Sequence, residues 1–155
     1  MIRNTITVNP ELMKTIFTIL LLTISMSTIA QIKVNHIAVH VSNLKESKDF
    51  YSAILGLEEI DEPFKDGLHG WYSIGSGSAL HIIEAPNTPT EISKVNHLCF
   101  SMEDMDAFIQ RLKDKNYPFE SWPGEKGVVT VRVDGIRQIY IQDPDGTWIE
   151  INDDY

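Results

Sequence analysis

Three histidines and one glutamate in this sequence have the side-chain chemistry of a divalent metal site. Imidazole nitrogens together with a carboxylate suit transition metals such as Zn, Ni, Fe, Mn or Co. The four candidate ligands are His36, His81, His97 and Glu150. Taken alone, a strand histidine is more often a hydrogen-bonded structural residue, and a single glutamate is more often a solvated charge. The metal hypothesis therefore depends on whether the fold brings the four together.

An internal repeat relates these residues in pairs. The segment Lys33-Val34-Asn35-His36-Ile37 returns as Lys94-Val95-Asn96-His97-Leu98, an offset of 61 residues from position 36 to position 97. A repeat of this length indicates two copies of one structural unit. His97 then matches His36 on the first strand of a unit, and Glu150 matches His81 on the last strand. A pseudo-two-fold relation between the copies would bring all four side chains together.

Each copy predicts a strand, a helix and further strands. A capping residue, Asn43 or Asp104, follows each repeated histidine by seven positions. Helices are expected over 44–55 and 105–115, ended by Gly56 and Asn116 in the left-handed conformation. The strands expected after them cover 57–61, 71–74 and 78–84 in the first copy, and 117–121, 128–133, 136–142 and 147–152 in the second. His69 falls between these segments and is expected in a solvated loop.

Strand alternation places the candidate ligands on one face. Apolar residues such as Val39 and Ile149 occupy the opposite face, which must pack against the helices. The sequence therefore predicts an α+β fold of two tandem βαβββ modules, 32–85 and 94–152, forming a curved mixed sheet around a metal or ligand cavity. His40 and Trp148 are further candidates to line this cavity.

Composition narrows the possible partners. The 155 residues are 43% hydrophobic, enough to build one packed domain. Asp and Glu (22) outnumber Lys and Arg (13), and the net charge of −9 opposes binding to nucleic-acid phosphates. A small-molecule partner fits better. The single Cys99 excludes an intrachain disulfide and a cysteine-rich zinc module.

The N-terminal segment predicts export. An uncharged apolar run over 16–30 follows Lys14 and ends in Thr28-Ile29-Ala30. A basic residue, a short apolar run and a small-x-Ala end are typical of a secretory signal, and this run is shorter than a spanning helix needs. We expect residues 1–30 to be a signal peptide, with Met13 as a second candidate start that would make 1–12 an over-extended start. The domain, 31–155, would be periplasmic or secreted, without a stable membrane anchor after cleavage.

The same residues resemble a known superfamily. The stretch from His36 through Phe50-Tyr51 to Leu55-Gly56 is similar to the opening motif of the vicinal oxygen chelate superfamily. Ala79-Leu80-His81-Ile82 and the segment starting at His97 resemble its later strands, and Asp143-Pro144-Asp145-Gly146 through Glu150 resembles its last hairpin. This superfamily groups glyoxalase I, fosfomycin- and bleomycin-resistance proteins and extradiol dioxygenases. The resemblance covers 34–152.

The resemblance implies a metal-dependent chemistry. It implies one divalent metal at His36, His81, His97 and Glu150, bidentate chelation of vicinal substrate oxygens, and homodimers. In glyoxalase-like members the final glutamate moves a proton between adjacent carbons, which would make Glu150 a catalytic base. Glyoxalase I enzymes usually have glutamate where this chain has His81. Glutathione-binding forms often have arginine where it has His40.

Three functions follow as hypotheses. The first is an exported metal-dependent lyase or isomerase of the glyoxalase type, similar to lactoylglutathione lyase. The second is a non-enzymatic binding or resistance protein of the same fold. The third is a metal-dependent thiol transferase or dioxygenase, for which His36, His97 and Glu150 would supply a two-histidine, one-glutamate set. His81 would then be a fourth ligand or an acid/base. The sequence names neither the substrate nor the metal, and it leaves open whether the modules pair within one chain or between two.

Overall fold

The computed structural model describes residues 9–15, 17, 32–86 and 92–155. The chain divides into two units, Met1–Lys33 and Val34–Tyr155. In the first unit, residues 10–15 are helical and exposed. Most of the predicted signal segment lies outside the described residues. Within the described ranges, no helix has the length and apolar character needed to cross a membrane.

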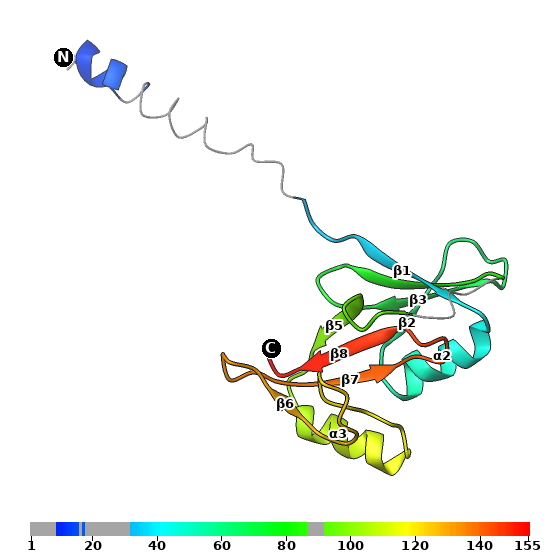
Figure 1. The fold of residues 1–155 in the computed structure, drawn as a ribbon. Coiled ribbons are helices and arrows are strands. Elements are labelled where there is room, and N and C mark those ends of the chain that lie inside the picture. The colour runs from blue at the N-terminus through cyan, green and yellow to red at the C-terminus, as the bar shows by residue number, and fades with distance from the viewer. Residues whose placement is uncertain (1–8, 16, 18–31, 87–91) are drawn as a thin grey trace. The chain divides into compact units, whose positions relative to one another are not determined.

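The first module of the second unit is one four-stranded sheet with one helix. Its elements are β1 (His36–Val41), α2 (Leu44–Ala53), β2 (Glu59–Ile60), β3 (His69–Ser73) and β4 (Ala79–Glu84). The strands lie in the order β1-β4-β3-β2 (Figure 1). The β1–β4 pair is parallel, and the β4–β3 and β3–β2 pairs are antiparallel. The sheet is therefore mixed, as predicted.

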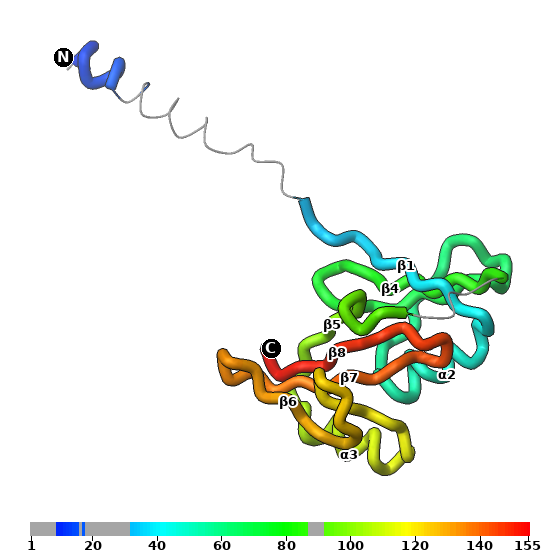
Figure 2. Tube along the Cα trace, viewed as in Figure 1, coloured from blue at the N-terminus to red at the C-terminus, as the bar shows by residue number. Residues whose placement is uncertain are grey.

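The second module repeats this topology. Its elements are β5 (His97–Ser101), α3 (Met105–Asp114), β6 (Thr130–Val131), β7 (Arg137–Gln142) and β8 (Trp148–Asn152). Their order, β5-β8-β7-β6, matches the first sheet strand for strand, and β8 runs between β5 and β7 (Figure 2). The two-module α+β fold is confirmed. Each module builds its own sheet, so the described strands form two four-stranded sheets rather than one continuous sheet.

Both helices begin where their caps predict, and they end at Ala53 and Asp114, two residues and one residue before the predicted ends. The Asn43 side chain accepts from the backbone N–H of Glu46, and the Asp104 side chain accepts from that of Ala107, which satisfies donors that a helix start leaves free. After the helices, Gly56 (φ +79°) and Asn116 (φ +51°) take the left-handed conformation. That conformation stops further helical hydrogen bonding.

The apolar strand faces and the helices form one core. Val39 and Val41 of β1, Leu80 and Ile82 of β4, and their counterparts on β5 to β8 pack with the inner faces of α2 and α3. The modules also bond directly, because the Tyr51 hydroxyl of α2 donates to Asp143 Oδ2 in the β7–β8 turn (3.0 Å). Figure 1 shows α2 beside that turn. The helices pack on one face of each sheet, so the opposite face is not part of this core.

Two predictions about local structure are wrong. Residues 117–121 are not a strand: Glu120 alone makes isolated bridges, to Lys126 and to Tyr140. His69 is not in a solvated loop, because it is the first residue of β3 and its side chain is only 15% exposed. Because His69 and Gly70 also pair with β4, strand β3 begins two residues before the start predicted from its apolar residues.

Candidate metal centre

Strand register defines one polar face on each sheet, which we call the ligand face. In module one it carries His36 of β1, His69 and Trp71 of β3 and His81 of β4, because Trp71 lies opposite His81 and Ala38 pairs with His81. In module two it carries His97 of β5, Tyr140 of β7, and Glu150 and Asn152 of β8. Each candidate ligand lies on the polar face of its own sheet, as strand alternation predicts, and its role as a metal ligand stays a prediction.

His36 and His81 form the pair of module one. Their ring centroids are 6.2 Å apart. The Nδ1–H of His36 donates to Asn35 Oδ1 at 2.8 Å, which leaves Nε2 with its lone pair free. His81 is 6% exposed, and burial, together with the nearby His69 and His36, lowers its pKa. A neutral imidazole is the form that binds a metal.

Two nitrogens in this pair's surroundings are unsatisfied. Within the described residues, His81 Nε2 and Trp71 Nε1 are buried without a hydrogen-bond partner. An unpaired buried polar group costs about 1–3 kcal/mol, so native proteins keep few of them. The two rings stack at 4.3 Å with planes 23° apart. A face-to-face stack prevents the indole N–H from donating to the imidazole, and both nitrogens stay available to a third group.

Sequence reasoning missed His69 as a member of this face. Its ring lies 5.0 Å from that of His81, and its Nδ1 bonds Asp66 Oδ1 at 2.7 Å. Phe64, on the loop before β3, stacks on His69 at 4.5 Å and lies parallel to His81 at 5.9 Å. The alternation of His69 with Trp71 was the available signal for a strand residue on the ligand face. Four aromatic rings therefore surround His81.

His97 and Glu150 form the pair of module two. The Nδ1–H of His97 donates to the backbone carbonyl of Lys94 at 2.8 Å, so its Nε2 points toward the carboxylate. Nε2 lies 3.4 Å from Glu150 Oε2. The imidazole nitrogen and the carboxylate oxygen therefore face the same point on the ligand face.

A buried hydrogen-bond network fixes Glu150. The Tyr140 hydroxyl donates to Oε2, and Asn152 Nδ2 donates to Oε1 at 3.0 Å. Gln138 Nε2 in turn donates to the Tyr140 hydroxyl at 3.0 Å. Burial by itself raises the pKa of Glu150, but hydrogen bonds from Tyr140, Asn152 and Cys99 outweigh it and hold this pKa below its usual range. Glu150 is a carboxylate at neutral pH, and Tyr140 is a site residue that only the cross-strand register reveals.

The donor atoms of the module-two pair are spaced as two ligands of one metal ion. Two atoms bound at ~2.0–2.1 Å to a tetrahedral ion lie about 3.3 Å apart. His97 Nε2 and Glu150 Oε2 are 3.4 Å apart. In module one, the unpartnered His81 Nε2 provides a second indication. Both repeated histidines also donate their other nitrogen to an oxygen, as metal-bound histidines usually do.

The chain keeps the two pairs separate. Across the described residues, no three His, Cys, Asp or Glu side chains are gathered closely enough to hold a metal ion. Each module thus supplies two potential ligands, and the single chain does not assemble the four-ligand site expected from the sequence. A second ligand-bearing face is needed to complete either pair.

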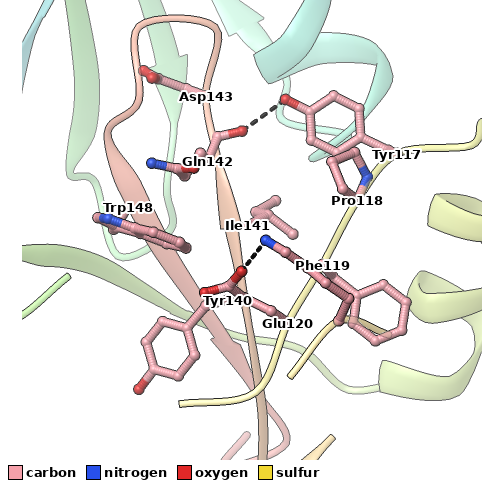
Figure 3. Close-up of a pocket in the computed structure, with 10 residues that line it drawn as sticks. Tyr117, Pro118, Phe119, Glu120, Tyr140, Ile141, Gln142, Asp143 and Trp148 are labelled. Carbon is pink, nitrogen blue, oxygen red and sulfur yellow. Dashed lines mark hydrogen bonds and ion pairs between the residues drawn. The ribbon is translucent and has the colours of Figure 1, made fainter. Parts of the chain in front are cut away.

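Both candidate cavity residues line cavities, and each also forms a hydrogen bond with a backbone carbonyl. His40 lines a cavity of about 350 Å³ between β1 and β5, together with Asn96 and His97, and its Nε2 bonds the carbonyl of Ala85 at 2.7 Å. Trp148 lines a cavity of about 190 Å³ between β7 and the segment 117–120 (Figure 3). Its Nε1 donates to the carbonyl of Ile92 at 3.1 Å. A role in substrate binding stays a prediction for both.

Comparison with known proteins agrees with the two-module topology. Residues 33–151 match the model of the Glyoxalase/Bleomycin resistance protein/Dioxygenase superfamily. The chain belongs to this superfamily. It is 30% identical to the Arabidopsis thaliana protein named Glyoxylase I 4, in an alignment of 124 positions that covers 76% of this chain and 68% of that protein.

Two lactoylglutathione lyases are among the superfamily members similar to this chain. The enzyme of Pseudomonas aeruginosa is 25% identical over 148 residues, covering 76% of this chain and 80% of the enzyme. The crystal structure of the Agrobacterium tumefaciens enzyme matches with a TM-score of 0.60 and 20% identity, over 79% of this chain and 94% of that chain. The structural match supports the fold, and the superfamily includes such lyases.

Proposed function

We propose that this protein is a metal-dependent enzyme of the glyoxalase type whose metal centre is completed in a homodimer. In this proposal, His36 and His81 of one protomer meet His97 and Glu150 of a second copy. One observation carries the proposal: the four ligand-type side chains form two pairs at matching positions of the repeated module, and among the described residues neither pair has the third ligand that a metal site needs.

The chain's own hydrogen bonds prepare the ligands. His36 and His97 would bind through Nε2, because their Nδ1–H groups are held by Asn35 Oδ1 and by the Lys94 carbonyl. His81 would bind through its unpartnered Nε2. When bound, a divalent ion such as Zn, Ni, Fe, Mn or Co supplies Lewis-acid polarisation of two vicinal oxygens of a small substrate.

Glu150 is the proposed proton carrier. It would take a proton from one substrate carbon and return it to the adjacent carbon. In the closed hydrogen-bond network this carboxylate is a weak base, because Tyr140 and Asn152 stabilise its charge. Loss of either hydrogen bond would make Glu150 a stronger base. Burial and the Glu150 carboxylate raise the pKa of the Cys99 thiol to about 12, which supports Glu150 rather than Cys99 as the reactive group.

Metal content tests the proposal. We would reconstitute the purified protein with Zn, Ni, Mn and Fe in turn and measure bound metal by elemental analysis. We expect about one ion per chain in the wild type and loss of the ion in the Ala variants of His36, His97 and Glu150. Loss in His81→Ala would make His81 a ligand, and retention would make it an acid/base. A protein that binds none of these metals contradicts the proposal.

A reaction screen tests the chemistry separately. We expect proton transfer within an α-ketoaldehyde–thiol adduct, measured as incorporation of deuterium from solvent at the receiving carbon. Glu150→Gln should abolish incorporation. Oxygen consumption on a catechol, without proton transfer on the adduct, would instead favour the dioxygenase class.

A binding module is the second candidate function. The cavity between β1 and β5 has apolar walls from Val39, Ile92 and Leu98, with His40 and His97 as polar groups. A small molecule could be held there without any reaction. Binding of a ligand by a protein that takes up no metal would favour this candidate.

Export is also proposed, on the sequence of the N-terminal segment alone. An uncharged run over 16–30 behind Lys14 supports a cleaved signal. Mass spectrometry of the protein from a native producing cell tests it: a chain beginning near Gln31 in the exported fraction is expected, and an intact N-terminus in the cytoplasm would contradict it.

A further inference from the structure

The cavity beside Trp148 is not lined by any of the four candidate metal ligands. It has a volume of about 190 Å³ and lies between β7 and segment 117–120 (Figure 3). Its aromatic lining residues come from both sides of this gap and from β8: Tyr117, Phe119, Tyr140 and Trp148. Small-molecule sites are usually concave, with apolar or aromatic walls and a few polar groups that fix the ligand. The polar groups of this cavity therefore indicate what it can hold.

Glu120 brings a buried carboxylate to the cavity wall. Its Oε1 accepts from Lys94, whose side chain is 16% exposed and also donates to two backbone carbonyls at 3.2 Å. Its Oε2 accepts from Lys126. Asp143, the other acid that lines the cavity, accepts from the Tyr51 hydroxyl and from two backbone N–H groups. A cation can therefore exchange at Glu120 Oε2 more easily than at Asp143.

Lys126 is the loosely held partner of Glu120. Its side chain is 77% exposed, and within the described residues its ammonium group bonds Glu120 alone. Solvent screens an ion pair at such an exposed position, and fixing a lysine side chain costs rotamer entropy, so the pair adds little stability. The backbone around Lys126 is held independently, because the next residue, Gly127, donates its N–H to the Phe119 carbonyl at 2.8 Å. The lysine ammonium can thus leave Oε2 while the loop stays folded.

The surroundings of Glu120 already hold ammonium groups. Lys94 Nζ lies 4.4 Å from the ring centroid of Trp148 and 5.2 Å from that of Tyr140, and both rings line the cavity. A cation over an aromatic face is attracted by the negative charge of the ring face. The net charge of −9 also attracts cations to this protein and repels anions. The chemistry of the cavity therefore favours a cationic ligand.

We propose that this cavity binds a small primary amine with an aromatic body, whose ammonium group replaces that of Lys126 at Glu120 Oε2. The ring of the ligand would lie among the aromatic walls, and Lys126 would act as an internal competitor that leaves when the amine binds. An aromatic carboxylate is the contrary possibility. It would need Lys126 as its partner and would bring a second negative charge beside Glu120. The amine site does not depend on the metal centre.

Three probes with the same ring separate charge from shape. Benzylamine is cationic, benzyl alcohol is neutral and benzoate is anionic. Each is titrated by calorimetry into the full chain in the presence of EDTA, so that no metal contributes. We expect benzylamine to bind, and the other two probes to bind at least about 10-fold more weakly, because a charge-assisted hydrogen bond to a carboxylate is lost. Benzyl alcohol binding as tightly as benzylamine would overturn the proposal.

The Lys126→Met variant removes the competing ammonium and keeps an unbranched apolar side chain. Benzylamine should bind this variant about 2- to 5-fold more tightly than the wild type, the range expected from the small contribution of an exposed ion pair. Lys113→Met, at an exposed position of α3, changes the net charge equally and is the matched control. Its affinity for benzylamine should equal that of the wild type. Equal affinity of the wild type and Lys126→Met would contradict the exchange of ammonium groups.

The Glu120→Gln variant tests the acceptor. It should bind benzylamine more than about 10-fold more weakly, with the fold checked by nuclear magnetic resonance. Lys126→Met keeps the proposal open to refutation if Glu120→Gln fails to fold, because its side chain is exposed. Benzoate that binds the wild type better than benzylamine does, and is lost in Lys126→Met, would show an anion site and overturn the amine assignment.

Discussion

The two ligand faces share a backbone and differ in how they hold their ligands. In module one, His81 is surrounded by aromatic rings and its Nε2 has no partner within the described residues. In module two, Glu150 is held by Tyr140, Asn152 and Cys99. Module one therefore presents imidazole nitrogens in a shell with few hydrogen bonds, and module two presents a fixed negative charge. The two modules place their candidate ligands at equivalent positions in the sheet, but the side chains around those ligands differ.

This difference assigns separate tasks to the modules. Neutral imidazoles bind a metal without adding charge, and unsatisfied nitrogens leave room for a further ligand. A carboxylate with several donors supplies charge and has a proton affinity that its donors adjust. The comparison predicts that variants of module one act on ligand access, whereas variants of module two act on the charge and pH dependence of the site.

The largest expected effect comes from removing a ligand. His36→Ala and Glu150→Ala should each weaken metal binding by more than about 100-fold, because a site loses far more from a missing ligand than from a missing outer partner. Competition with a chromophoric chelator measures this. His40→Ala is the matched control on the same face of β1: its Nε2 bonds Ala85, so affinity should stay within about twofold. An equal loss in His40→Ala would contradict the ligand assignment.

Breaking the Glu150 network should have the next largest effect. Tyr140→Phe removes one donor to the carboxylate and should weaken metal binding about 10-fold. The tyrosine helps to lower the pKa of Glu150, so its removal raises that pKa, and protons then displace the metal at a higher pH. The measurement is metal occupancy against pH. Tyr117→Phe, whose hydroxyl donates to the Gln142 carbonyl, is the control. Identical pH profiles for wild type and Tyr140→Phe would refute the charge-fixing role.

The pH dependence of protein stability tests a second buried carboxylate of module two. Glu120 is 7% exposed and pairs with Lys94 and Lys126. Burial raises the pKa of Glu120, but the two lysines outweigh it and lower the pKa. A lowered carboxylate pKa stabilises the fold above the unfolded value of about 4.3, and this contribution is lost as the pH falls through the folded value.

Glu120→Gln should therefore reduce the free energy of unfolding by about 1–2 kcal/mol at pH 7, with the difference shrinking below about pH 4.3. Urea unfolding at several pH values measures it, and Glu103→Gln, at an exposed position of the same module, is the control. A difference that is constant with pH would argue against a role for the carboxylate charge.

The smallest expected effect concerns access to module one. Phe64 is 56% exposed yet stacks over His69 and His81. Phe64→Ala should uncover His81 and speed metal association about two- to fivefold, with less than about 1 kcal/mol lost in stability because the ring is largely outside the core. Stopped-flow quenching of tryptophan fluorescence measures the rate. Leu68→Ala, another exposed apolar residue of this loop, should leave it unchanged.

Much of the scaffold could be predicted because its signals are local. The repeat indicated two modules, the caps at Asn43 and Asp104 indicated the helix starts, and strand alternation placed His36 and His97 on the polar face. The neighbours of each ligand depend on cross-strand register, which the turn geometry sets and periodicity does not reveal. Tyr140 beside Glu150 and His69 beside His81 therefore emerged only from the structure.

The division of the four ligands into two pairs could not be predicted either. The internal repeat shows that the two modules are equivalent in sequence. It does not show which modules face each other in space. Packing of α2 against the β7–β8 turn, through Tyr51 and Asp143, is a long-range contact with no sequence signature of its own.

Mixing two inactive variants tests the completed centre most directly. His36→Ala/His81→Ala lacks the module-one ligands, and His97→Ala/Glu150→Ala lacks those of module two. Neither homodimer should bind metal. If the centre forms between copies, a mixed dimer carries one intact site and one empty one, so elemental analysis of dimers purified through two different tags should find about one ion per mixed dimer, against about two per wild-type dimer. Mixed dimers with no metal, beside a wild type that binds it, would contradict a centre shared between two chains.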